Sequence, residues 1–302
     1  MKKIIITGST GFVGNNLSKY LVNKGIEIAE VNREMLSKLS SAPLNLNHDD
    51  VLVHLAGKAH DLKKTMDPSA YYTVNYQLTA DLYDAFLRSD AKKFIFVSSV
   101  KASADTVDGI LTEEEIPNPL TDYGKSKLQA EDYIRSQPLP DGKTYYILRP
   151  CMIHGPGNKG NLNLLFKFVQ KGIPYPLASF TNKRSFLSVE NLCFVITELI
   201  NQNIPSGIYN VADDQALSTN EVVSLLANAS GKEARLWRIP VVCVKALARI
   251  GDLFKLPITS ERLSKLTENY IVSNKKIKSE IGKELPRSSV EGLTITAVSF
   301  KD

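Results

Sequence analysis

The sequence is poor in cysteine and histidine. The three cysteines, Cys151, Cys193 and Cys243, are far apart and form no CxxC pair, and the chain has only four histidines. This spacing argues against a disulfide framework and against a zinc site, and it is typical of a protein kept in a reducing compartment. We therefore expect no metal centre and a cytoplasmic location.

Long apolar runs and long runs of one charge are also missing. The apolar run near the amino terminus covers only residues 4–6, which is too short for a signal peptide or a membrane span. The 37 basic and 32 acidic residues give a net charge of +5 and are interspersed along the chain. A nucleic-acid-binding arm is therefore not predicted, and we expect neither a nucleic-acid partner nor stable insertion into a membrane.

One later stretch, residues 239–254, is apolar over most of a helical surface and is interrupted by Lys245, Arg249 and Asp252. We expect it to pack against the smaller part of the chain or against a partner subunit. Contact with a membrane surface is the alternative.

Short β-rich runs alternate with helical patterns through the first half of the chain. Strands are predicted at residues 3–7, 27–32, 50–55, 93–98 and 144–149, and helices at residues 15–24, 75–89 and 122–136. This alternation predicts an α/β protein with a Rossmann-type doubly wound parallel sheet. We assign residues 1–150 to that domain.

The sequence pattern changes after residue 150. Loops rich in glycine, proline and asparagine here separate predicted helices at residues 162–171, 189–201 and 219–231. We assign residues 151–302 to a smaller α/β substrate-binding domain, part of which, within residues 186–212, could pack back on the first domain.

A glycine motif follows the first predicted strand. Residues 7–14 read TGSTGFVG, which places Gly8, Gly11 and Gly14 between a strand and a helix. These positions would allow a tight turn, close approach of a pyrophosphate to the helix N-terminus, and close helix–strand packing. An ordinary glycine turn is the alternative. We predict a nicotinamide dinucleotide site that also includes the intervening residues Thr10, Phe12 and Val13.

The second and third predicted strands complete this site. The second strand ends in Asn32 and Arg33 with no carboxylate for an adenosine ribose, and Arg33 could instead pair with a 2′-phosphate. We therefore expect NAD(P), with a slight preference for NADP(H). The third strand continues into Leu55, Ala56 and Gly57, where the backbone would pass close to the cofactor ribose. His54, within that strand, is expected to be a hydrogen-bonded structural residue.

Tyr123 and Lys127 lie one helical turn apart in TDYGKSKLQAE. A second YxxxK pair, Tyr20 and Lys24, occurs in the first predicted helix, so the spacing alone is weak. Tyr123 is better placed because it follows a strand that ends in Ser98 and Ser99. A phenol assisted by an ammonium could exchange a proton with a sugar oxygen, which a serine hydroxyl would orient. A surface tyrosine and lysine on an amphipathic helix are the alternative.

An ordered set of motifs resembles the extended short-chain dehydrogenase/reductases, in particular the NAD-dependent epimerase/dehydratase family. The set comprises TGSTGFVG, DVLVHLAG, TVNYQLTA with Asn75, FVSSVKAS with Ser98, YGKSK, LRPCMIHGPG and RSFLSVENL. The resemblance implies that Ser99, Tyr123 and Lys127 are catalytic and that Asn75, Ser98 and Pro150 border the cofactor. It also implies that Arg184 binds a substrate pyrophosphate, with Ser99, Lys101, Asn161 and Arg262 as further substrate-site candidates.

The resemblance extends to a nucleotide-sugar substrate, but not to every reaction of the family. The family's dehydratases carry an Asp-Glu pair where this sequence has Val100 and Lys101, which argues against elimination of water. We expect hydride transfer at C4 of a UDP-hexose or UDP-N-acetylhexosamine derivative, most readily as reduction of a 4-ketone. A UDP-sugar 4-epimerase is the alternative, and a non-enzymatic dinucleotide sensor is a remote one. A homodimer formed through the helices at residues 75–89 and 122–136 is also expected.

Overall fold

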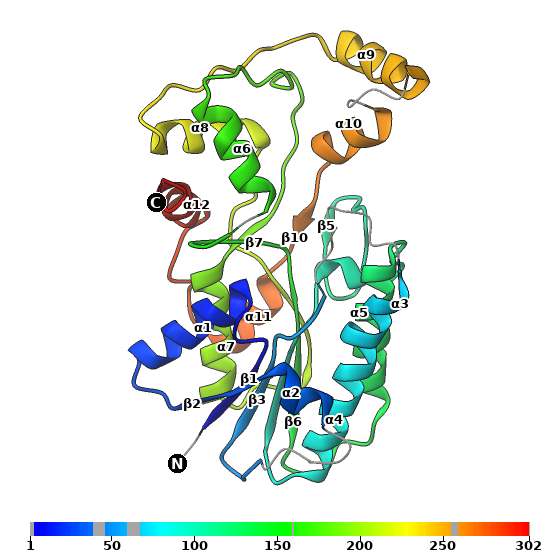
Figure 1. Ribbon diagram of the computed structural model, residues 1–302, viewed down its shortest axis with the longest axis vertical. Coiled ribbons are helices and arrows are strands. Elements are labelled where there is room, and N and C mark those ends of the chain that lie inside the picture. The colour runs from blue at the N-terminus through cyan, green and yellow to red at the C-terminus, as the bar shows by residue number, and fades with distance from the viewer. Residues whose placement is uncertain (1–2, 39–45, 59–66, 159, 255–258, 302) are drawn as a thin grey trace.

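The computed structural model describes residues 3–38, 46–58, 67–158, 160–254 and 259–301 (Figure 1). Its centre is a six-stranded sheet with the order β2-β1-β3-β4-β6-β9, in which every neighbouring pair is parallel. The strands are β1 (Ile4–Thr7), β2 (Ile28–Val31), β3 (Val51–His54), β4 (Lys93–Val97), β6 (Thr144–Pro150) and β9 (Gly207–Val211). The predicted Rossmann-type parallel sheet is confirmed.

Alternate residues of each strand enter two separate cores. Ile4 and Ile6 of β1 lie in one core, whereas Ile5 lies in the other, as the period of two along a strand requires. Helices α1 (Phe12–Asn23), α7 (Val189–Asn201) and α11 (Lys275–Ile281) cover the first face, and α4 (Leu78–Arg88) and α5 (Asp122–Ser136) cover the second. The sheet is therefore buried on both faces.

The order of the strands creates a switch point between β1 and β3. The chain leaves β1 for β2 on one side and then returns to β3 on the other side of β1. In open α/β sheets, ligands bind outside the carboxyl ends of the strands at such a point. The short helix α2 (Arg33–Ser37) follows β2, and the 3₁₀ turn η2 (Val100–Ala102) follows β4. Both therefore lie near the edge where a ligand is expected.

A smaller group of elements lies beyond the carboxyl ends of the sheet (Figure 1). Helices α6 (Asn161–Gln170), α8 (Thr219–Ala229) and α12 (Ser289–Val298) share one apolar cluster, and α9 (Val241–Phe254) packs on α10 (Ser260–Thr267). Two short strand pairs, β7 (Met152–His154) with β8 (Phe186–Ser188) and β5 (Ile110–Leu111) with β10 (Ile271–Val272), connect this group to the sheet. No helix within the described residues is both long and apolar enough to cross a bilayer.

Among the features that were not predicted, two belong to the sheet and its covering helices. Strand β9 pairs with β6, although only three of its five residues, Ile208, Tyr209 and Val211, are apolar or aromatic and no periodic pattern surrounds them. The helix predicted at residues 75–89 instead begins as α3 (Ser69–Tyr71) and passes through a π-helical segment, η1 (Tyr72–Gln77), before α4. The division into domains stays a prediction, and we propose that α7 and β9 belong with the sheet because they complete its edge and one of its faces.

A buried ion pair joins α5 to β6. Both carboxylate oxygens of Glu131 accept hydrogen bonds from Nε of Arg149, at 3.1 and 3.0 Å. The hydroxyl of Ser98 donates to the same carboxylate at 2.5 Å. Glu131 and Arg149 are 0% and 1% exposed, so water cannot replace either partner. Because the carboxylate is fully engaged, it fixes the position of α5 relative to β4 and β6.

Replacing Glu131 by alanine should therefore lower the free energy of unfolding by about 3–5 kcal/mol, since Arg149 would keep a buried and unpaired charge. Urea denaturation measures this loss. Asp132→Ala is the matched control, because Asp132 is exposed and pairs with the exposed Arg135 at 3.6 Å, and it should change stability by less than about 1 kcal/mol. Equal losses in the two variants would contradict the role given to the buried pair.

Candidate functional site

The turn after β1 passes against the end of β3. Gly8 has a φ of +75°, and a methyl group added there would lie 2.6 Å from the backbone nitrogen of Ala56. Gly14 is equally confined, because an added methyl group would collide with the carbonyl oxygen of Gly8. Larger residues at these positions would push the turn away from β3. The two glycines thus hold the backbone at the switch point of the sheet.

The N-terminus of α1 is open at this turn. Gly11 is the N-cap, and within the fully described residues 8–15 no side chain caps the helix and no acidic residue occupies its first turn. Thr10 and Gly11 are exposed, whereas Phe12 and Val13 are half-buried. Free backbone N–H groups and the positive end of the helix dipole favour an anion here. A dinucleotide pyrophosphate suits this cradle, which has no space for additional side chains.

His54, at the end of β3, has a structural role in the described chain. Its Nδ1 is hydrogen-bonded to Oγ1 of Thr7 at 2.7 Å and its Nε2 to Oγ1 of Thr79 at 2.9 Å. Burial lowers its pKa to about 3, with a smaller contribution from the charge of Lys127. The imidazole is therefore neutral and joins β1, β3 and α4. Beyond it, Leu55 and Ala56 each donate a backbone hydrogen bond to Thr7, to its carbonyl and its hydroxyl respectively.

Asn75 explains why the helix before α4 is distorted. Its Oδ1 accepts the backbone N–H of Lys58 at 2.7 Å, and its Nδ2 donates to Oγ of Ser126 on α5 at 3.1 Å. π-helical turns are frequent at functional sites, and this one carries the amide towards the segment after β3. A methyl group added at Gly57 would lie 3.1 Å from Oδ1 of Asn75 and 3.2 Å from Nζ of Lys127. Asn75, Gly57 and Lys127 are therefore close neighbours.

Ser99 and Tyr123 are brought together from β4 and α5. Burial raises the pKa of Tyr123, and a side-chain hydrogen bond with Ser99 partly opposes that rise. Ser99 also accepts the backbone N–H of Lys101 at 3.2 Å, which fixes its rotamer. The ring of Tyr71 stands edge-on to Tyr123, with centroids 6.1 Å apart. The phenol is thus held in a defined position with a hydroxyl partner.

Lys127 lies one turn further along α5 and is only 4% exposed. Its Nζ donates to the carbonyl oxygen of Val97 at 3.0 Å and lies 4.7 Å from the centre of the Phe96 ring. Burial lowers its pKa to about 8, and the carboxylate of Glu131 acts in the opposite direction. At neutral pH the ammonium is therefore charged and buried near the phenol-bearing turn of the helix.

Ser98 and Pro150 were both predicted to border the cofactor. The hydroxyl of Ser98 is directed to Glu131, so this side chain faces the interior. Pro150 is the last residue of β6, opposite Val211 of β9, and is buried at the carboxyl edge of the sheet. The backbone N–H of Ser98 is also engaged, because it donates to the carbonyl oxygen of Leu148 at 2.7 Å.

A second group of polar side chains continues from Ser99 towards the smaller part of the molecule. Nζ of Lys101 donates to the carbonyl of Asp105 at 2.8 Å and lies 4.2 Å from the centre of the Tyr270 ring. Arg184 pairs through its backbone with both Leu217 and Tyr270, and its guanidinium donates to Oε1 of Glu268 at 3.1 Å. The structure therefore brings Lys101 and Arg184 to the same region.

The remaining predicted residues lie at the surface. Arg33 is the exposed first residue of α2, and Asn32 caps that helix by accepting the N–H of Met35 at 2.9 Å. Asn161 and Arg262 are exposed at the starts of α6 and α10. No group of three or more His, Cys, Asp or Glu side chains in the described ranges could hold a metal ion.

Four residues near this region were not singled out from the sequence: Glu131, Arg149, Glu268 and Tyr270. Each acts through a partner that is distant in the chain; Glu268 lies 84 residues after Arg184. Periodicity within a segment gives no signal for such pairs. Glu131 alone offered a hint, because it is a charged residue on the same helical face as Lys127.

Comparisons with known proteins agree with this geometry. Residues 4–212 match the model of the NAD dependent epimerase/dehydratase family. A UDP-glucose 4-epimerase of Vibrio cholerae is 33% identical over 99% of this chain and 95% of its own. A GDP-6-deoxy-D-mannose reductase of Pseudomonas aeruginosa is 25% identical over 79% of this chain and 84% of its own.

A solved structure shares the fold. The crystal structure of UDP-N-acetylglucosamine 4-epimerase from Bacillus cereus superimposes with a TM-score of 0.76 at 22% identity, covering 99% of each chain. The family model spans β1 to β9, which includes the glycine turn, the end of β3 and the start of α5. The chain is therefore an enzyme of the NAD dependent epimerase/dehydratase family.

Proposed function

We propose that this enzyme transfers hydride at C4 of a nucleotide-linked hexose, namely a UDP-hexose or UDP-N-acetylhexosamine derivative. The observation that carries the proposal is the contact between Ser99 and Tyr123 with the Lys127 ammonium buried one turn away. Such a group suits proton exchange with a sugar hydroxyl or ketone.

A nicotinamide dinucleotide would lie across the turn of Gly8 and the N-terminus of α1, with Gly57 and Asn75 near its ribose. When bound, the cofactor accepts or supplies hydride at the sugar carbon. Tyr123 moves the accompanying proton between its phenolic oxygen and the sugar oxygen. The Ser99 hydroxyl orients that oxygen, and the charge of Lys127 favours the phenolate. The positive charge of Lys127 is needed because burial raises the pKa of Tyr123 before any ligand binds.

The sugar's diphosphate would extend from Ser99 towards Lys101 and Arg184. A guanidinium can bind a phosphate through two parallel hydrogen bonds, but that of Arg184 is already engaged by Glu268. A diphosphate would therefore displace the Glu268 carboxylate or share the Arg184 guanidinium with it. Asn161 and Arg262 stay candidates for the outer part of this site, because both occupy the first turns of exposed helices beyond the sheet.

Two observations favour different reactions. The exposed Arg33 follows β2, and the carboxylate of the next residue, Glu34, is paired with Lys38 at 2.7 Å, which supports binding of a 2′-phosphate and hence reduction of a 4-ketone with NADPH. The relative at 33% identity is named as a UDP-glucose 4-epimerase, which supports NAD and epimerisation as the second candidate. Intact Ser99, Tyr123 and Lys127 disfavour a non-enzymatic sensor.

A homodimer and a cytoplasmic location stay predictions. The large apolar side chains of α4 and α5 are buried or half-buried within the chain itself. The hydroxyl of Tyr133 on α5, for example, donates to Asp84 on α4 at 2.7 Å. The aromatic residues that suggested a subunit interface therefore have partners in the same chain.

Tyr123→Phe should reduce kcat by about 10²–10⁴-fold, because the variant keeps the ring but has no proton to exchange. Cofactor binding should be retained. Tyr20→Phe is the matched control, since Tyr20 belongs to the other YxxxK pair and contacts Lys24 instead; it should keep full activity. The measurement is turnover of a UDP-4-keto sugar or a UDP-hexosamine, with cofactor binding followed by fluorescence. Full activity in Tyr123→Phe would refute the assignment.

Turnover should also decline as the pH rises through about 8. The pKa of Lys127 is lowered to about 8, so the ammonium is present below this pH and lost above it. Without that charge, the phenolate of Tyr123 is less favoured. Lys127→Arg should retain charge at high pH, and its residual activity should show no decline near pH 8. A wild-type rate that stays constant between pH 7 and about 9.5 would contradict this account.

The nicotinamide cofactor released on denaturation separates the two reactions. A reductase should be purified largely without cofactor and should consume NADPH only with a 4-keto sugar. Arg33→Asp should then raise KM for NADPH about tenfold or more, because a charge-assisted hydrogen bond contributes roughly 1.5–3 kcal/mol. The matched control is Lys19→Asp on α1, which makes the same change of charge and should leave KM for NADPH unchanged. Release of stoichiometric NAD, with conversion of a UDP-hexosamine in the absence of added cofactor, would instead identify an epimerase.

A further inference from the structure

Helix α9 has two opposite apolar faces, of which only one is covered. Val244, Ala248 and Gly251 are buried and contribute to a cluster with Leu263 of α10. We call the opposite side the outer face of α9. It consists of Val242, Leu247, Ile250, Leu253 and Phe254, which are 78%, 59%, 47%, 77% and 67% exposed. Five large apolar side chains on one helix face are more than the scattered exposure that is normal for a protein surface.

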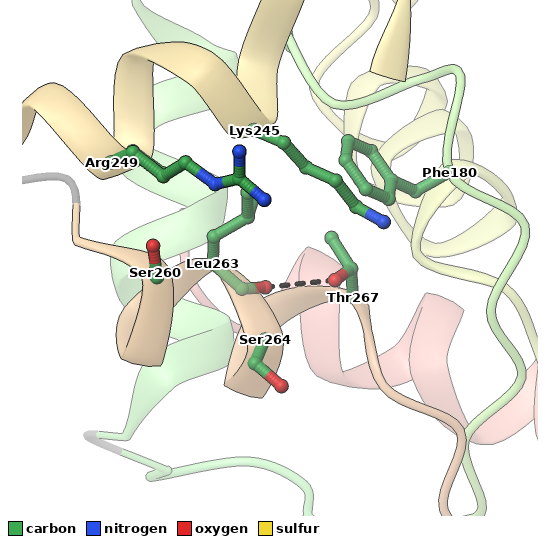
Figure 2. Close-up of a pocket in the computed structure, with 8 residues that line it drawn as sticks. Phe180, Lys245, Arg249, Ser260, Leu263, Ser264 and Thr267 are labelled. Carbon is green, nitrogen blue, oxygen red and sulfur yellow. Dashed lines mark hydrogen bonds between the residues drawn. The ribbon is translucent and has the colours of Figure 1, made fainter. Parts of the chain in front are cut away.

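The charged residues of α9 lie between these two faces. Successive residues of a helix are about 100° apart, which places Lys245, Arg249 and Asp252 in one strip along the helix. Figure 2 shows Lys245 and Arg249 extending from α9 over a pocket in front of α10. This pocket has a volume of about 450 Å³ and is also lined by hydroxyl groups of Ser260, Ser264 and Thr267. Lys245 and Arg249 provide suitable donors for a phosphate group, whereas the hydroxyls of Ser260 and Thr267 already donate to Asp252 and to the carbonyl oxygen of Leu263.

The excess positive charge of the chain is concentrated around this helix. Residues 235–266 contain seven of the 37 basic residues and two of the 32 acidic residues, so the rest of the chain contains 30 of each. The whole net charge of +5 therefore belongs to this segment. It also holds the only tryptophan, Trp237, which is 58% exposed. Tryptophan is favoured where an apolar phase meets water.

The position of α9 leaves its outer face accessible. In Figure 1, α9 lies at the end of the molecule that is furthest from the central sheet. The helix has 14 residues and is thus about 21 Å long, shorter than the roughly 30 Å of a bilayer core. It could lie within the surface of a bilayer but could not cross one.

We propose that the outer face of α9 docks on an anionic lipid bilayer, with Lys245 and Arg249 at the level of the lipid phosphates. An amphipathic helix with apolar side chains on one side and basic residues beside them is suited to that interface. A two-fold contact with a second copy is disfavoured, because it would bring the same basic segment of both subunits together. The proposal rests on α9 and its surroundings and is independent of the reaction at Tyr123.

Co-sedimentation with vesicles tests the proposal. The full-length protein should bind vesicles of phosphatidylglycerol and phosphatidylcholine mixed in equal parts, and should bind pure phosphatidylcholine vesicles much more weakly. Leu253→Ser combined with Phe254→Ser should lower the partition coefficient about tenfold or more, since each exposed side chain loses apolar area that the bilayer would bury. Lys245→Gln combined with Arg249→Gln should weaken binding and reduce its dependence on salt.

The matched control is Ile116→Ser combined with Leu120→Ser, which removes two apolar side chains that are 85% and 68% exposed but lie outside this segment. It should bind vesicles as the wild type does. Circular dichroism and turnover with a water-soluble substrate should be unchanged in all three double variants, which separates this test from that of the catalytic residues. The proposal is overturned if the wild type does not sediment with anionic vesicles, if the α9 variants bind normally, or if they convert a dimer into monomers in light scattering instead.

Discussion

The catalytic side of this molecule depends on one buried carboxylate. Glu131 accepts hydrogen bonds from Arg149 of β6 and from Ser98 at the end of β4, and so fixes α5 against two neighbouring strands. Tyr123 and Lys127 precede it on the same helix, whereas Ser99 follows Ser98 directly. A shift of α5 would therefore separate the phenol from the Ser99 hydroxyl. Hydrogen bonds to buried charges hold such geometry firmly, because water cannot replace a lost partner.

The carboxylate of Glu131 also raises the pKa of Lys127 and so favours its charged form. Burial lowers the pKa of the ammonium, and the charge of Glu131 opposes that effect. With a pKa of about 8, Lys127 is charged at neutral pH but loses its charge as the pH rises through this value. Burial likewise disfavours the charged form of Tyr123, the phenolate, and so raises its pKa. Groups whose pKa values are shifted by burial and by a neighbouring charge are frequent at active sites.

Local sequence patterns predicted the elements that carry their own periodicity. Helix α5 has the predicted bounds, and β1, β3, β4 and β6 agree to within one or two residues, because each is a short apolar run between turn residues. Ser99, Tyr123 and Lys127 were predicted to be catalytic from their order relative to the glycine turn, although the YxxxK spacing occurs twice, and their roles stay a prediction. Partners such as Glu268 for Arg184 could not be predicted, since nothing within either segment depends on the other. The π-helical segment around Asn75 could not be predicted either, because the partner of this amide, the backbone N–H of Lys58, is 17 residues away in the chain.

The pairing of Arg184 with both Leu217 and Tyr270 has a consequence for the order in which a growing chain can complete its parts. Ser99, Tyr123 and Lys127 all belong to the first 127 residues, and five strands of the large sheet are available by residue 150. The carboxylate that engages Arg184 follows only 84 residues after it. During synthesis, these five strands can therefore be made before the residues that engage Arg184 exist, whereas α7, β9 and α11, which complete the sheet and cover one of its faces, follow later.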